Sequence, residues 1–187
     1  MNNKYWFINL ECIGMQVLFS AFSLIFYNSI MPPKLFSLFT AYLLIWAIHS
    51  TFWQLGNKER KNIIIKNNHL DRGEKPFKQN RLKGAVIGLP FFIFNAMFLI
   101  ITCLFNTDIL VTIESVLQFT FSGFLPLPND NLGREYFIPR LIVCIIIYIP
   151  CVTAYFSGSY NFSLTEKILP KIIYKTQSDK KGKNIGN

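Results

Sequence analysis

Charged residues are scarce in this chain. They make up 16% of its 187 residues, whereas hydrophobic residues make up 51%. Soluble globular domains usually contain about 25% charged residues. This composition argues against an ordinary soluble domain, so the placement of the apolar residues matters most.

The sequence also lacks the motifs of well-known catalytic and metal sites. It contains no phosphate-binding loop, no GxSxG elbow, no HExxH pair and no dinucleotide fingerprint. It has two histidines, His49 and His69, and four cysteines, none of which forms a CxxC motif. We therefore expect no catalytic residue, no metal and no cofactor, and we predict a non-enzymatic protein.

What the chain does contain is four uncharged stretches, each longer than 20 residues. About 20 apolar residues in a helix cross the hydrocarbon core of a bilayer. The sequence therefore predicts an all-α integral membrane bundle of four transmembrane helices, forming a single domain over residues 1–187. The first stretch is too long for the apolar region of a signal peptide, so we expect it to be a retained span. The expected spans cover about residues 9–31, 35–56, 84–106 and 138–158.

Lysine and arginine are concentrated in two regions. Loop 57–83 has nine basic and three acidic residues, and the tail 159–187 has six basic and two acidic residues. Segment 107–137 instead has four acidic residues and one basic residue. Basic residues accumulate in short cytoplasmic loops, and four spans place the loop and the tail on one side. We predict a multi-pass cell-membrane protein with both termini and loop 57–83 in the cytoplasm.

The basic loop has Phe77 as its single aromatic residue. It therefore lacks the stacking platform that binds single-stranded nucleic acid, and we expect no nucleic-acid partner. Lysine and arginine next to a membrane each gain about 1 kcal/mol of attraction to anionic lipid. We expect this loop to contact the anionic lipids of the inner leaflet.

Four polar residues within the spans are candidates for intramembrane contacts: Glu11, Gln16, His49 and Asn95. Ionisable residues inside a membrane often have a functional role. Glu11 begins the first span and His49 lies in the cytoplasmic half of the second, so the two side chains could meet. Alternatively, the polar residues form packing seams between helices, and Glu11 is solvated at the interface.

Gly84 and Gly88 form a small-xxx-small pair at the start of the third span. Such a pair allows a neighbouring helix to approach closely, so we expect helix packing at these two glycines. In the outer segment, polar residues recur at helical spacing between residues 108 and 122. This periodicity predicts an amphipathic helix that lies in the outer interface or caps the bundle.

The second and fourth spans end in similar sequences, "STFWQLGN" and "VTAYFSGS". Their alignment pairs Trp53 with Tyr155 and Gly56 with Gly158. An aromatic anchor three residues before a terminating glycine predicts a helix stop at the inner interface in both places. The similarity also suggests two helical hairpins related by a parallel repeat.

The segments "FWQLGNKERKN", "RLKGAVIGL" and "YFSGSYNFSLTEKILPKIIYK" resemble a group of uncharacterised small multi-pass membrane proteins from AT-rich Gram-positive bacteria. Those proteins have a glycine and a charged cluster after the second helix, and a Ser-x-x-Glu-Lys element after the last. The resemblance implies a multi-pass architecture and no particular activity. The matching residues are Gly56, Lys58, Glu59, Arg60, Ser163, Glu166 and Lys167.

These observations leave two hypotheses for function. The first is a non-enzymatic membrane protein that acts as a homo-oligomer or as a subunit of a membrane complex. The second is a small transporter whose path is lined by Glu11, Gln16, His49 and Asn95. An enzyme acting on lipid would need a clustered acid, base and nucleophile, for which the sequence offers Glu11 and His49 alone.

Overall fold

The computed structural model describes residues 3–26, 33–70, 74–105, 107–123, 125 and 134–160. The described part of the chain is helical and contains no strand, so the predicted all-α fold class is confirmed. Its elements are α1 (Asn3–Phe26), α2 (Pro33–Asn68), α3 (Lys83–Phe105), α4 (Asp108–Leu117), the 3₁₀ helix η1 (Phe119–Phe121) and α5 (Arg134–Ser159).

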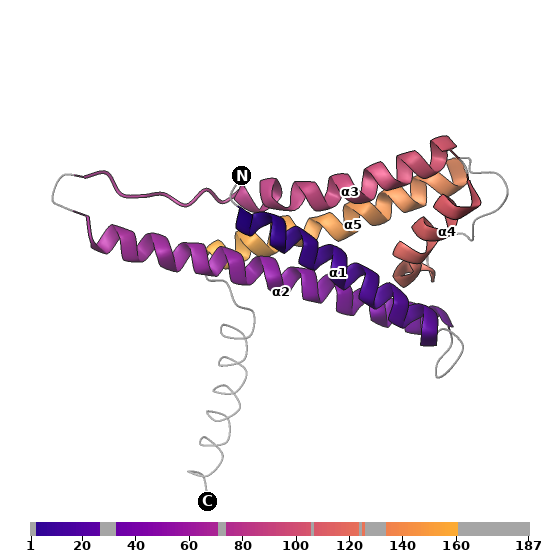
Figure 1. Cartoon of the computed structure of the whole chain (residues 1–187). Coiled ribbons are helices and arrows are strands. Elements are labelled where there is room, and N and C mark those ends of the chain that lie inside the picture. The colour runs from indigo at the N-terminus through magenta and orange to yellow at the C-terminus, as the bar shows by residue number, and fades with distance from the viewer. Residues whose placement is uncertain are drawn as a thin grey trace, which may run out of the picture.

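Four of these helices are long and apolar enough to cross a membrane, as a multi-pass membrane protein requires. α1 and α3 run in one direction, and α2 and α5 run in the other (Figure 1). We call the end of the bundle where α5 finishes the basic end, and the opposite end the α4 end. The four segments are Tyr5–Phe26, Lys34–Asn68, Lys83–Phe105 and Phe137–Ser159.

The parallel helices α2 and α5 touch backbone to backbone near the basic end. A Cβ atom added to Gly56 would lie under 3.0 Å from the carbonyl oxygen of Tyr155, and one added to Gly158 would lie equally close to that of Trp53. Each glycine thus faces the residue that lies three positions before the other glycine. The two sequence segments that resemble each other are therefore in reciprocal contact.

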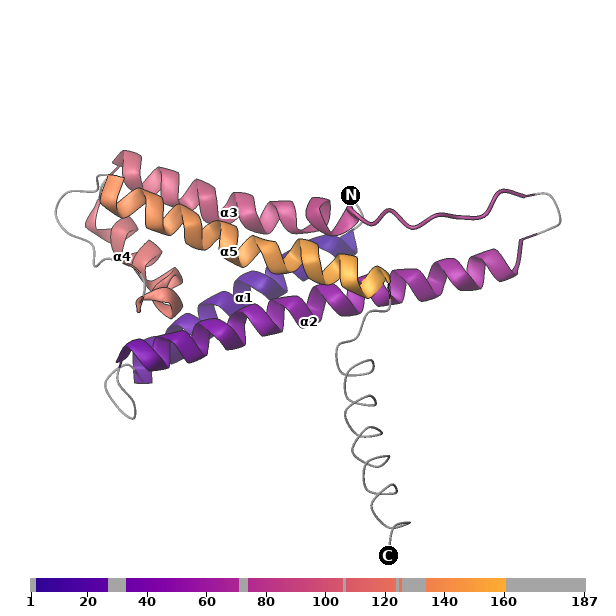
Figure 2. The same ribbon diagram turned by 180° about the vertical axis from the view of Figure 1, so that it is seen from behind.

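Two further glycines bring α3 against α5. A Cβ atom on Gly84 would overlap the side chain of Tyr155, and one on Gly88 would lie 2.8 Å from the Cβ atom of Cys151. The helix pair α3 and α5 lies side by side in both views (Figures 1 and 2). The small-xxx-small pair thus lies in a helix interface, where a larger residue would separate the helices.

α4 and η1 fold into the α4 end of the bundle, between α1 and α2 on one side and α3 and α5 on the other (Figure 1). The hydroxyl of Ser20 on α1 donates to the carbonyl oxygen of Leu117, 2.9 Å away, and the hydroxyl of Ser37 on α2 donates to that of Thr120, 2.8 Å away. These bonds satisfy carbonyl groups where α4 ends. The sequence predicted an amphipathic helix that either lies in the outer interface or caps the bundle, and in the structure α4 caps the bundle.

α2 does not end at Gly56, and this part of the sequence prediction is wrong. The helix continues for twelve residues to Asn68, so the first half of the expected loop 57–83 is helical. The charged residues after Gly56 end the hydrophobic stretch. They do not end the helix, because Lys, Arg and Glu are good helix formers. Gly56 serves close packing against α5 instead. α5 does end next to its glycine, at Ser159.

Some sequence predictions fall outside the described residues. These include the tail from residue 161 onward, with Ser163, Glu166 and Lys167, and the turn between α1 and α2.

Candidate functional site

The four long helices converge on one carboxylate at the basic end. The side chain of Glu59, on α2, accepts hydrogen bonds from the hydroxyl of Tyr5 on α1 (2.8 Å), the ammonium of Lys83 on α3 (2.7 Å) and the hydroxyl of Tyr155 on α5 (2.6 Å). We call these four residues the Glu59 cluster. A single side chain therefore connects every long helix of the bundle.

The Glu59 cluster is partly shielded from solvent. The Glu59 side chain is 18% exposed and that of Lys83 is 35% exposed. The Lys83 ammonium also lies 4.9 Å from the centre of the Tyr5 ring, within cation–π range. Hydrogen bonds to an ionised group are about twice as strong as neutral ones. The cluster therefore holds the four long helices together at the basic end. Without Glu59, two tyrosines and a lysine would lose their hydrogen-bond acceptor.

Beyond the Glu59 cluster, α2 extends past the ends of α3 and α5 (Figure 2). Residues 57–68 of α2, together with the returning segment 74–82, form what we call the basic arm. The side-chain amide of Asn67 donates to the carbonyl oxygen of Phe77 (3.1 Å) and accepts from the amide nitrogen of the same residue (2.8 Å). This paired contact holds the returning segment against α2.

Two more contacts fix the base of the basic arm. The side chain of Gln79 donates to the carbonyl oxygen of Gly56, 3.1 Å away. The guanidinium of Arg81 lies 4.1 Å from the centre of the Tyr160 ring and donates to its hydroxyl. The arm is therefore a built structure with its own hydrogen bonds.

The surface of the basic arm combines positive charge with apolar side chains. Ile64 and Ile65, adjacent on α2, are 45% and 55% exposed. A projecting basic surface that also exposes isoleucine is suited to bind a partner or a membrane surface. Its exposed cations are Lys58, Lys61, Lys66, Lys75, Lys78 and Arg81.

The α4 end holds a buried ion pair. The guanidinium of Arg140 on α5 donates to the carboxylate of Glu114 on α4, and the two residues are 3% and 1% exposed. The nearby side chain of Ser115 also accepts from Arg140, at 3.4 Å. Removal of one partner would leave an uncompensated buried charge, so the pair attaches α4 to α5.

Among the four polar residues proposed from the sequence, Gln16 and Asn95 lie together. The amide of Gln16 donates to the side-chain oxygen of Asn95, 2.8 Å away, and to the carbonyl oxygen of Leu117. Both side chains are buried between α1 and α3. Asn9, about two helical turns before Gln16 on the same face of α1, donates to the carbonyl oxygen of Ile87. These residues form a polar seam between the two helices.

Glu11 and His49 are not part of that seam. Glu11 is exposed on α1, His49 is half-buried on α2, and no hydrogen bond or ion pair joins them within the described part of the chain. The Glu11–His49 contact that the sequence left open is therefore not observed in the structure. Helical geometry explains this, because Gln16 faces α3 and Glu11, five residues earlier, points to a different side of α1.

The sequence alone did not predict the contacts of Glu59 and Glu114. Glu59 belongs to the charged cluster after the second span, and that position does not indicate which residues it contacts. Glu114 and Arg140 carried a signal that could have been used: a cation at the start of an apolar span needs a nearby anion. The described residues contain no group of three or more His, Cys, Asp or Glu side chains that could hold a metal ion.

The comparisons with known proteins add no relative. The chain matches no protein-family model, and no curated protein or solved structure is significantly similar to it.

Proposed function

We propose that this chain is a non-enzymatic membrane protein that acts as a subunit of a membrane complex or as a homo-oligomer, and that the basic arm is its docking surface. The observation that supports the proposal most is the ordered arm. It projects past the bundle, exposes cations and two isoleucines, and is held by side-chain hydrogen bonds. Such an arrangement costs conformational entropy, which a contact with a partner offsets.

The Glu59 cluster gives the arm a fixed direction. Because it connects α2 to the other three long helices at the point where the arm begins, the arm keeps its orientation relative to the bundle. Partners that bind a pre-organised surface lose less entropy on binding. In the proposed topology the arm and both termini face the cytoplasm, and its cations also contact anionic lipid of the inner leaflet of the cell membrane.

The proposal is tested by purifying the full chain in a mild detergent and measuring the mass of the particle by light scattering. We expect a homo-oligomer or a defined complex. Charge reversal on the arm, with Lys61→Glu, Lys66→Glu and Lys75→Glu combined, should release the partner. Lys34→Glu is the matched control, because Lys34 is also exposed but lies at the α4 end of α2.

A strictly monomeric particle without a co-purifying protein would contradict the proposal. So would an assembly that Lys34→Glu weakens as much as the three arm substitutions do, since the docking surface would then lie elsewhere. Circular dichroism and thermal unfolding of each variant separate loss of docking from loss of fold.

The second candidate is a small transporter, and one observation favours it. The side-chain oxygens of Asn9 and Gln16 are buried and have no hydrogen-bond donor among the described residues. Buried acceptors of this kind are uncommon unless they serve a function. This reading predicts uptake or efflux that is lost in Asn95→Leu, with His49→Phe as a second variant. Transport that continues unchanged in Asn95→Leu would exclude the polar seam as its path.

A further inference from the structure

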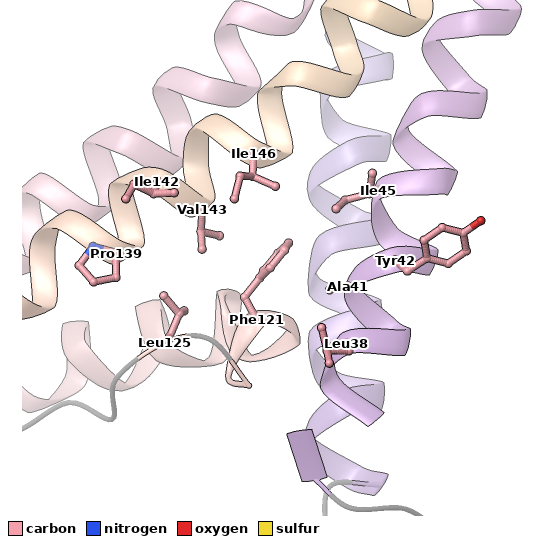
Figure 3. A pocket seen from close by; sticks show the side chains of 10 residues that line it. All are labelled: Leu38, Ala41, Tyr42, Ile45, Phe121, Leu125, Pro139, Ile142, Val143 and Ile146. Carbon is pink, nitrogen blue, oxygen red and sulfur yellow. The ribbon is translucent and has the colours of Figure 1, made fainter. Parts of the chain in front are cut away.

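An apolar groove opens between α2 and α5 toward the α4 end. Its volume is about 510 Å³, within the usual range of ligand-binding pockets. Val143 and Ile146 line it from α5 and Ile45 lines it from α2, while the ring of Phe121 rises between the two helices (Figure 3). All the residues that line the groove are apolar or aromatic.

The groove opens sideways, to the outside of the bundle. Ile142 and Ile146 on one wall are partly exposed, and so are Leu38 and Tyr42 on the other. In a protein whose helices cross a membrane, such an opening faces hydrocarbon. A molecule that enters from this side must therefore be largely apolar, as the hydrocarbon chain of a lipid is.

A second cavity of about 300 Å³ adjoins the groove at Leu125, which lines both. Most of its lining is apolar, but Ser115, Gln118 and Ser122 contribute polar side chains to it. Gln118 is 2% exposed, yet its side-chain oxygen has no hydrogen-bond donor among the described residues. The hydroxyl oxygen of Ser122 is also buried without a partner there. A buried amide oxygen in this state favours a ligand that brings a donor.

The charge next to the second cavity is balanced. Arg140 is its one charged lining residue, and its guanidinium is already paired with the carboxylate of Glu114. A phosphate group would compete with that carboxylate and would have to be desolvated next to it. The cavity is therefore suited to an uncharged headgroup with a hydroxyl.

From these observations we propose that the two cavities form one binding site for a neutral lipid with a free hydroxyl, of the diacylglycerol type. One hydrocarbon chain lies in the groove between α2 and α5. The hydroxyl reaches the second cavity, where it donates to the side-chain oxygen of Gln118. The site lies in the half of the membrane nearer to α4 and is independent of the basic arm.

The test uses the full chain in nanodiscs of phosphatidylcholine that contain a few per cent of a diacylglycerol with a photoreactive group in one acyl chain. After irradiation, the labelled peptides are identified by mass spectrometry. We expect labelling concentrated on the groove walls of α2 and α5 and removed by excess unlabelled diacylglycerol. Phosphatidic acid with the same acyl chains should compete at least tenfold more weakly.

Two variants and one control locate the site. Ile146→Phe fills the groove and should reduce the specific labelling severalfold. Ile149→Phe is the matched control, because Ile149 is exposed on the same helix and does not line the groove. Gln118→Leu removes the acceptor and should raise the concentration of diacylglycerol needed for half-maximal competition about fivefold.

Three results would overturn the proposal. One is labelling spread evenly over all lipid-facing helices, as expected if bulk lipid or another part of the chain fills the groove. The second is competition by phosphatidic acid as strong as that by diacylglycerol. The third is an equal loss of labelling in Ile146→Phe and Ile149→Phe. The wild-type competition experiment decides the matter even where a variant fails to fold.

Discussion

Gly56 and Gly158 face each other's helices at the crossing of α2 and α5, and each lies against the backbone carbonyl of the residue three positions before the other. The atoms next to them are matched as well, since Gly56 lies near the amide of Ser159 and Gly158 near that of Asn57. This reciprocity places a local two-fold relation between two parallel helices. It gives the similarity between "STFWQLGN" and "VTAYFSGS" a structural reason, because both segments form the same contact.

A methyl group at this crossing should separate the helices. Gly56→Ala or Gly158→Ala is expected to lower the free energy of unfolding by about 1–3 kcal/mol, because the added carbon overlaps backbone atoms. The double variant should cost less than the sum, since one displacement relieves both overlaps. Thermal unfolding in mild detergent measures the effect. Gly14→Ala is the control, because no atom lies within 4 Å of the added carbon, and it should be neutral or stabilising.

Loss of the carboxylate of the Glu59 cluster should loosen the basic end. We expect Glu59→Gln to reduce the free energy of unfolding by about 2 kcal/mol, since three donors lose an ionised acceptor. Tyr155→Phe removes one of these bonds and should cost about 1 kcal/mol. The control is Glu74→Gln in the exposed return of the arm. If Glu59→Gln unfolds at the same temperature as Glu74→Gln, the cluster does not stabilise the bundle.

The buried ion pair at the α4 end should show strong coupling. Arg140→Leu and Glu114→Leu each leave one buried charge, and each is expected to cost about 3 kcal/mol or more. The double variant should recover most of this loss, because no unpaired charge remains. Unfolding of the four proteins by increasing sodium dodecyl sulfate gives the coupling energy. Additive losses would show that the two charges do not act as a pair.

The order of the basic arm depends on Asn67. Asn67→Ala removes both hydrogen bonds to the backbone of Phe77, so the amide hydrogen of Phe77 should exchange roughly five- to tenfold faster. Asn68→Ala is a matched control, because Asn68 is an exposed asparagine on the next position of α2. Hydrogen exchange followed by mass spectrometry reports the difference. Equal exchange in the two variants would mean that other contacts hold the returning segment.

Hydropathy was enough to predict the four long helices, and the spacing of Gly84 and Gly88 was enough to predict a packing face. Both are local properties of the sequence. The length of α2 was not predicted, because hydropathy reports where a helix leaves the hydrocarbon and not where it ends. Polar residues such as those between Gly56 and Asn68 form helices in water as well.

The Glu59 cluster could not be read from the sequence for a different reason. Tyr5, Lys83 and Tyr155 are 54, 24 and 96 positions away from Glu59 along the chain. Their meeting depends on how far each helix rises and rotates in the bundle. Sequence spacing constrains such relations within one helix only, which is also why the sequence left the contact between Glu11 and His49 open.

α2 is a single unbroken helix from Pro33 to Asn68, with no proline in its interior. Near one end Ser37 bonds to the backbone of η1, and further along Glu59 bonds to the other three long helices. A rod of this kind has no joint between the Ser37 contact and the Glu59 cluster. The packing of Gly56 against α5 and the Glu59 cluster oppose a displacement of this rod, which extends about 18 Å beyond Gly56 at 1.5 Å per residue. In mechanical terms, α2 is a strut that holds the α4 end and the basic arm at a fixed separation.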